Sequence, residues 1–142
     1  MKNESSVWLS PHFHLSEFTL SGTALRLGID NTPSAEVVAR LEALCVNVLE
    51  PLRRRVGCVR VTSGYRSPRL NAAVGGVAHS QHLLGEAADL YVSSTEMAQK
   101  WAAVLRETPF DQLIFEPRGS KHRRWLHVSY TTRHAPRHQV LL

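Results

Sequence analysis

The segment from Ser80 to Asp89, which reads Ser-Gln-His-Leu-Leu-Gly-Glu-Ala-Ala-Asp, constrains the fold of this chain more than any other. It places the imidazole of His82 and the carboxylate of Asp89 seven residues apart, between small residues that allow close backbone packing. Asp89 falls in an otherwise apolar stretch, where burying an unpaired carboxylate would be costly. A metal ion bound by both side chains would remove this cost.

A second imidazole, His127, lies thirty-eight positions after Asp89 in the short apolar run Trp125–Val128. A lone histidine, among the eight in this chain, is more often an ordinary hydrogen-bonded residue. Two histidines and one aspartate together suit zinc and leave the fourth tetrahedral position for water. Catalytic zinc sites keep that position open, so His82, Asp89 and His127 predict a metal-dependent hydrolase.

The length and composition indicate one globular domain over residues 1–142. A chain of 142 residues can bury a hydrophobic core without the help of disulfides or a structural metal. Its content of 43% hydrophobic and 20% charged residues is ordinary for a soluble protein. No apolar run approaches the roughly 20 residues needed to cross a bilayer. Residues 1–10 show no secretory signal, so we expect synthesis in the cytoplasm, and we expect a monomer.

The two cysteines, Cys45 and Cys58, lie in apolar surroundings and lack the C-x-x-C spacing of many metal sites. We expect both to be buried free thiols in preference to a disulfide. Neither cysteine is expected to bind zinc, so the metal ligands remain histidine and aspartate.

Basic residues give the chain a formal net charge of +5 and gather at Arg53–Arg55 and Lys121–Arg124. Such clusters can meet nucleic acid, anionic cell-wall polymer or lipid head groups, and a merely solvated face is the alternative, which we favour for Arg53–Arg55. No aromatic residues interleave with these clusters to stack on bases. We therefore expect no nucleic-acid partner.

The strongest helical pattern runs over Val37–Arg55, where apolar residues recur at a spacing of three to four. Ser34 is the expected N-cap, and the basic residues at the other end suit the helix dipole. The other expected elements are a helical lead-in ending at Gly28, strands Val59–Thr62, Ala87–Val92, Gln112–Glu116 and Trp125–Ser129, and helices Arg69–Val74 and Thr95–Glu107.

This order of elements predicts an α+β domain with a small, mainly antiparallel sheet. The sheet is expected to carry the metal site on one face and to pack helices on the other. Its last two strands, Gln112–Glu116 and Trp125–Ser129, are expected to form a hairpin with a basic tip. Residues 1–12 and 131–142 are expected to be extended or mobile.

Three motifs together resemble a known family. They are S-x-H-x-x-G-x-A-x-D at Ser80–Asp89, S-G-Y-R-S-P at Ser63–Pro68 and W-x-H at Trp125–His127. They look like the zinc D-alanyl-D-alanine carboxypeptidases and their peptidoglycan endopeptidase relatives, which include vancomycin-resistance dipeptidases and several phage endolysins. The resemblance covers about residues 13–130 and is greatest to short phage- or prophage-borne members. It implies the fold shared with lysostaphin-type peptidases and the hedgehog signalling domain.

The resemblance implies zinc as the cofactor and His82, Asp89 and His127 as its ligands, the residues that the spacing already selects. Arg66 matches the family arginine that binds and polarises the scissile carbonyl, where a fixed cation would stabilise the oxyanion. Ser80 matches a serine that contacts the substrate. The alternatives are an ordinary turn arginine at Arg66 and a helix cap at Ser80.

The general base departs from the family pattern. Many relatives carry an acidic residue three positions before the last histidine, where it takes a proton from the attacking water, but here that position is Arg124. Glu116, at the end of the neighbouring strand, is the expected base instead. His122, five positions before His127, is the expected auxiliary that stabilises the transition state. The alternative for Glu116 is an ion pair with a basic hairpin side chain.

The resemblance implies a peptidoglycan peptidase that cleaves cell-wall peptides, either as a D-Ala-D-Ala carboxypeptidase or as a stem-peptide endopeptidase. Such an enzyme would act on the wall after release or delivery from the cell. A non-catalytic, zinc-containing wall-binding or phage-particle module is the alternative, and Arg124 in place of the usual acid favours it. Nucleic-acid binding rests on charge alone.

Overall fold

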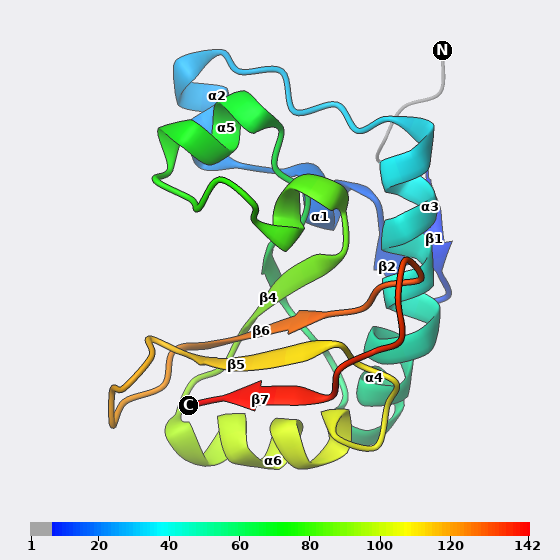
Figure 1. Ribbon diagram of the computed structural model, residues 1–142, viewed down its shortest axis with the longest axis vertical. Helices are drawn as coiled ribbons and strands as arrows, with labels where there is room; N and C mark the ends of the chain where they lie inside the picture. The colour runs from blue at the N-terminus through cyan, green and yellow to red at the C-terminus, as the bar shows by residue number, and fades with distance from the viewer. Residues whose placement is uncertain (1–6) are drawn as a thin grey trace.

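The computed structural model describes residues 7–142; residues 1–6 of the predicted N-terminal extended segment lie outside the described part. The chain is an α+β domain in which helices pack against a five-stranded sheet, with a two-stranded hairpin near the N-terminus (Figure 1). In chain order the elements are β1 (Trp8–Ser10), β2 (Phe13–His14), α1 (Ser16–Thr19), α2 (Gly22–Leu27), α3 (Ala35–Leu44), η2 (Cys45–Leu49), α4 (Glu50–Val56), β3 (Val61–Ser63), α5 (Pro68–Ala73), η3 (Gln81–Leu84), β4 (Ala87–Tyr91), α6 (Thr95–Leu105), β5 (Gln112–Glu116), β6 (Trp125–Ser129) and β7 (Gln139–Leu141).

The main sheet has the strand order β3-β4-β6-β5-β7. The strands β3, β4, β6 and β5 pair antiparallel, whereas β7 joins β5 in parallel. The sheet is therefore mixed, and the prediction of a mainly antiparallel sheet is wrong. The cause is the C-terminal segment, which returns to the start of β5, where the Gln139 N–H donates to the Asp111 carbonyl at 2.9 Å. Part of the segment predicted to be extended or mobile thus forms an edge strand.

The two faces of the sheet differ because successive residues of a strand point to opposite sides. On one face Asp89 in β4 lies opposite His127 in β6, which in turn lies opposite Ile114 in β5. The other face is apolar and joins a core that includes buried residues of α3, α4 and α6. Its buried side chains are Ala88, Leu90, Leu113, Phe115, Leu126 and Val128. Helices therefore cover one face and leave the polar face to form a site.

The helix predicted over Val37–Arg55 is confirmed as a continuous helical segment made of α3, η2 and α4. Its predicted cap is also confirmed, since the Ser34 side chain accepts a hydrogen bond from the Val37 N–H at 3.3 Å. The five residues of η2 form a π-helix just before Pro51. Because proline lacks an N–H and its ring crowds the carbonyl four residues earlier, the wider π-helical turn accommodates it.

Both cysteines are free thiols, as predicted. Cys45 is buried in the core, and burial raises the pKa of its thiol, which stays protonated. Cys58 is exposed, so the prediction of a buried thiol there is wrong. The reason is local: Gly57, with a positive φ of 87°, turns the chain out of α4, and Cys58 follows that turn at the surface.

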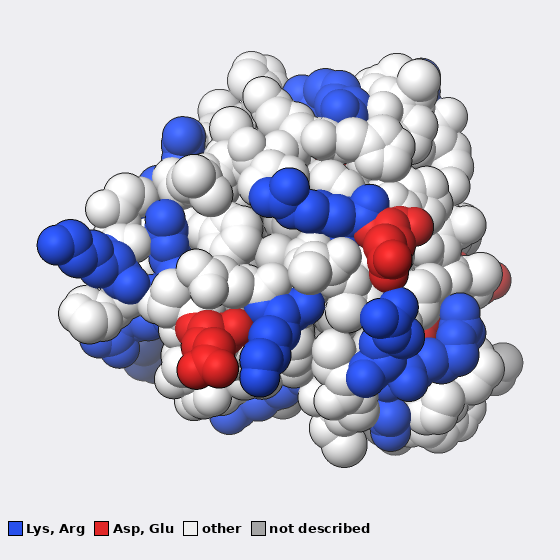
Figure 2. Space-filling view, turned by 90° about the horizontal axis from the view of Figure 1, so that it is seen from below, with Lys and Arg blue, Asp and Glu red and all other residues white. Residues whose placement is uncertain are grey.

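Basic side chains on the face seen from below form several separate groups, two of them beside acidic side chains (Figure 2). Arg55, from the predicted Arg53–Arg55 cluster, forms an ion pair with Glu107 at 3.0 Å. Both partners are largely exposed, so this cluster fits the solvated face expected for it. Within residues 7–142, each helix is too short or too polar to cross a membrane.

Replacing Leu90 by alanine tests the assignment of the apolar face. Leu90 is fully buried, so we expect Leu90→Ala to lower the free energy of unfolding by about 2–5 kcal/mol through lost burial and a residual cavity. Leu25→Ala, at a side chain that is 74% exposed, is the matched control and should cost less than about 0.5 kcal/mol. Urea unfolding followed by circular dichroism measures both, and equal losses would contradict the assignment.

Candidate metal centre

Three elements bring His82, Asp89 and His127 together. His82 lies in η3, Asp89 in the middle of β4 and His127 in the middle of β6, directly opposite Asp89. One donor atom from each side chain lies within 4.8 Å of the other two. Two of these positions are therefore set by strand pairing, and the third by the short helix that precedes β4.

The donor atoms converge on one carboxylate oxygen. Asp89 Oδ1 lies 3.3 Å from His82 Nε2 and 3.1 Å from His127 Nδ1. The two imidazole rings lie edge to face, with centroids 5.1 Å apart. Two nitrogens and one oxygen turned toward a common point are a donor set that zinc accepts. The residues present therefore fit a zinc ion.

The tautomer of His82 suits this role. His82 is buried, and its Nδ1–H donates to the Gly64 carbonyl at 2.6 Å. Because a carbonyl can only accept, Nδ1 carries a proton, and Nε2 is the nitrogen left to bind a metal. The Arg66 N–H donates to the His82 carbonyl at 3.1 Å, which ties η3 to the segment after β3.

The charge of Asp89 is stabilised within the cluster. Burial alone would raise the pKa of its carboxyl, but hydrogen bonds from His127 and His82 outweigh burial and hold the pKa well below its usual range. The carboxylate is therefore ionised at neutral pH, as a metal ligand must be.

The backbone around η3 delivers His82 to the strands. The Ser80 hydroxyl accepts a hydrogen bond from the His82 N–H at 3.2 Å, so the capping role considered for Ser80 is present. Gly85 ends η3 with a φ of 75°, in the left-handed region that favours glycine. A Cβ at Gly85 would lie 2.8 Å from Val37 Cγ1. The glycine of the motif thus permits both the turn and the close contact with α3.

The cluster opens into a cleft of about 550 Å³. Other side chains around this cleft include Arg66, Ser80, Gln81, Ile114, Glu116 and Trp125. The structure thus brings two predicted groups, Arg66 and Glu116, to the same cleft as the three candidate ligands. Burial lowers the pKa of Arg66, and the Asp89 charge opposes that shift. Among the described residues, none hydrogen-bonds to the buried Arg66 Nε.

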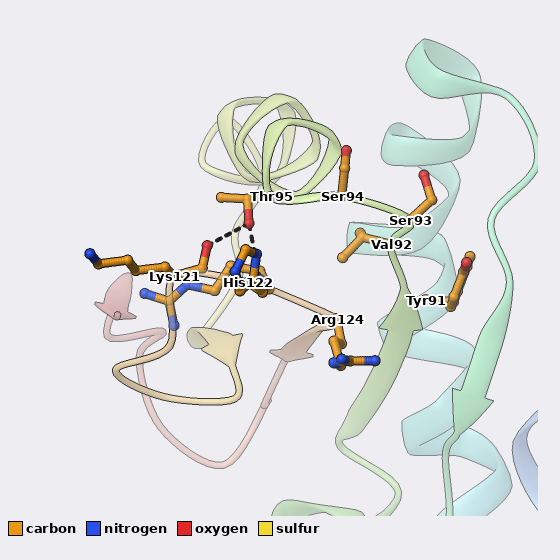
Figure 3. A pocket seen from close by; sticks show the side chains of 9 residues that line it. Tyr91, Val92, Ser93, Ser94, Thr95, Lys121, His122 and Arg124 are labelled. Carbon is orange, nitrogen blue, oxygen red and sulfur yellow. Dashed lines mark hydrogen bonds between the residues drawn. The ribbon is translucent and has the colours of Figure 1, made fainter.

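The structure does not bring His122 to this cleft. His122 and Arg124 line a different pocket, at the N-terminal end of α6 (Figure 3). Thr95 holds the loop there, because its Oγ1 donates to the Lys121 carbonyl at 2.9 Å and accepts from the Arg123 N–H at 3.0 Å. The auxiliary role predicted for His122 therefore has no geometric support.

Sequence reasoning assigned no role to Gln81 beyond lining the site. Its Oε1 lies 2.8 Å from His127 Nε2, the ring nitrogen that faces away from Asp89. The sequence feature that could have indicated a role for Gln81 is its position next to His82, because a residue adjacent to one ligand is held near the other ligands.

The family comparison agrees with this geometry. A family model described as Peptidase M15 matches residues 11–129, which include the three candidate ligands, Arg66 and Glu116. A search of curated proteins found no match. The match covers most of the chain, and the resemblance inferred from the motifs is confirmed: the chain belongs to the Peptidase M15 family.

Proposed function

We propose that this protein is a zinc-dependent peptidase that hydrolyses peptide bonds of bacterial peptidoglycan. The observation that carries the proposal is the convergence of His82, Asp89 and His127 within 4.8 Å in a chain of a peptidase family. Zinc held by these residues would supply Lewis acidity, polarising a substrate carbonyl and lowering the pKa of water from 15.7 toward about 7.

Arg66 is suited to bind the carbonyl oxygen of the scissile bond. It lines the cleft beside Asp89, and no described residue pairs with its guanidinium. A cation that is already in place and partly desolvated stabilises negative charge as it develops in the transition state, commonly by about 3–4 kcal/mol. The proposal therefore gives Arg66 the oxyanion role.

Glu116 is suited to move the proton. In β5, Ile114 lies opposite the candidate ligand His127, and Glu116 follows two residues later on the same face of the sheet. The Cα atoms of Ile114 and Glu116 are therefore about 7 Å apart along the strand. The ion pair with a hairpin cation, the alternative for this residue, is not found among the described residues. Glu116 would take a proton from the attacking water and return it to the leaving amine.

The shape of the site favours an endopeptidase over a carboxypeptidase. A second cleft, of about 350 Å³, shares Arg66 and Asp89 with the first and continues past them along α2 and β3. A substrate chain could thus extend on both sides of Arg66. Among the described residues that line the two clefts, Arg66 is the only arginine or lysine. A carboxypeptidase would need a further cation or donor for the terminal carboxylate, and in place of a second lysine or arginine the described residues of the two clefts offer uncharged donors such as Ser80 and Gln112 for it.

Metal analysis of the purified protein tests the metal centre. We expect about one zinc per chain, and we expect His82→Ala to lose it because a two-ligand site binds weakly. His122→Ala, at an exposed histidine that lines a different pocket, is the matched control and should keep the metal. Retention of stoichiometric zinc by His82→Ala would remove His82 from the ligand set.

The variant Glu116→Gln tests the general base. It keeps the shape of the side chain but cannot accept the proton, so we expect kcat on purified peptidoglycan to fall by roughly 10²–10⁴ with zinc content unchanged. Glu96→Gln, at an exposed glutamate of α6, is the control. Unchanged hydrolysis would exclude Glu116 as the base. Tight wall binding by the native protein without hydrolysis would favour the non-catalytic module.

Mass spectrometry of the released fragments distinguishes the two peptidase activities. We expect cleavage inside the stem or crosslink peptides, which exposes new amino groups, because the two clefts extend on both sides of Arg66. Release of free terminal D-Ala as the main product would instead show a carboxypeptidase. The His82→Ala variant supplies the background in the same assay.

A further inference from the structure

We propose that Gln81 positions His127 for the metal, and that the C-terminal segment 131–137 holds Gln81 in place through Asp111. This inference rests on the proposed zinc centre and adds a positioning residue to it. The segment 131–137 lies outside the family match, which ends at residue 129. The metal centre would therefore depend on a part of the chain that the family motifs do not include.

The contact between Gln81 and His127 selects the tautomer of the histidine. Gln81 Oε1 accepts from His127 Nε2–H at 2.8 Å, while His127 Nδ1 lies 3.1 Å from Asp89 Oδ1. With a proton held on Nε2 by Gln81, Nδ1 is the nitrogen that would bind the metal. Gln81 thus does for His127 what the Gly64 carbonyl does for His82.

The side chain of Gln81 can serve as an acceptor only in one orientation of its amide. Asp111 selects that orientation, because its Oδ2 accepts from Gln81 Nε2 at 3.3 Å. If the amide turned over, its NH₂ would face the His127 N–H and its oxygen would face the Asp111 carboxylate. Both contacts would then be repulsive.

Arg137 fixes the Asp111 carboxylate. Its Nε donates to Oδ1 at 3.0 Å and its terminal nitrogen donates to Oδ2 at 2.8 Å, while its backbone N–H donates to Oδ1 at 2.9 Å. Asp111 is 1% exposed; burial would raise its pKa, but the hydrogen bonds from Arg137 outweigh burial and lower it. Asp111 is therefore an ionised acceptor, and Gln81 must donate to it.

A second buried acid ties the same segment to η3. Arg133 donates to both oxygens of Glu86, at 3.0 and 2.8 Å, and the Thr131 hydroxyl donates to it at 3.0 Å. The Glu86 N–H donates to the Gln81 carbonyl at 3.1 Å. Figure 1 shows this segment leading from β6 to β7. The side chain of Gln81 thus connects to the C-terminal segment through the Asp111 carboxylate. Its backbone connects to the same segment through Glu86, whose N–H binds Gln81 and whose carboxylate binds Arg133.

The zinc affinity of Gln81→Leu tests the positioning role. Competition with a chromophoric chelator gives the zinc Kd of the full chain, and we expect Gln81→Leu to raise it by about 10–100-fold, as loss of such a partner does. Gln112→Leu, which removes a glutamine from the same cleft without touching a candidate ligand, should keep the native Kd. The thermal unfolding of the metal-free variants should match that of the native chain.

A double-variant cycle tests the role of the C-terminal segment. We expect Arg137→Gln to weaken zinc binding, and we expect little further loss when it is combined with Gln81→Leu, because both act through one contact. Arg118→Gln, at an exposed loop arginine, is the control. Native zinc affinity in Gln81→Leu would overturn the inference and leave the metal centre standing. Absence of zinc binding by the native chain would overturn both.

Discussion

The ionised carboxylate of Asp89 is the constraint on which the rest of this structure depends. It lies in an apolar strand, where burial disfavours its charge, and it is stabilised by imidazoles 3.3 and 3.1 Å away. Those contacts exist only while β4 and β6 keep their register and η3 presents His82 to them. The site and the sheet are therefore stabilised by the same pairing.

The two-faced sheet explains why such a site can be rigid. Its apolar face packs into a continuous core with α3, α4 and α6, so the strands that carry Asp89 and His127 cannot shift independently. The outer nitrogen of each histidine then has a fixed acceptor, Gly64 for His82 and Gln81 for His127. Ligands oriented by such partners on regular elements lose little freedom when a metal binds.

Local patterns predicted the elements that depend on local chemistry. The bounds of β5 and β6 agree with the alternation of the sequence, and the Ser34 cap agrees with its helix-entry signal. The sequence did not predict β7 as a strand, because a three-residue edge strand carries little pattern of its own and forms by pairing with β5. His122 was predicted to lie near the metal, but its loop lies beside α6 because Thr95, distant in sequence, binds that loop by two hydrogen bonds.

The sequence by itself determined which side chains could meet a metal, because Asp89 among apolar neighbours needs a partner and the glycine of its motif permits a tight turn. It also indicated that Arg66 and Glu116 would lie near them. Only the tertiary structure decided which nitrogen of each imidazole faces Asp89, and that Gln81 holds one of them. The reason is that these choices depend on acceptors contributed by Gly64 and by the chain around Asp111, and a linear pattern does not record which distant groups become neighbours.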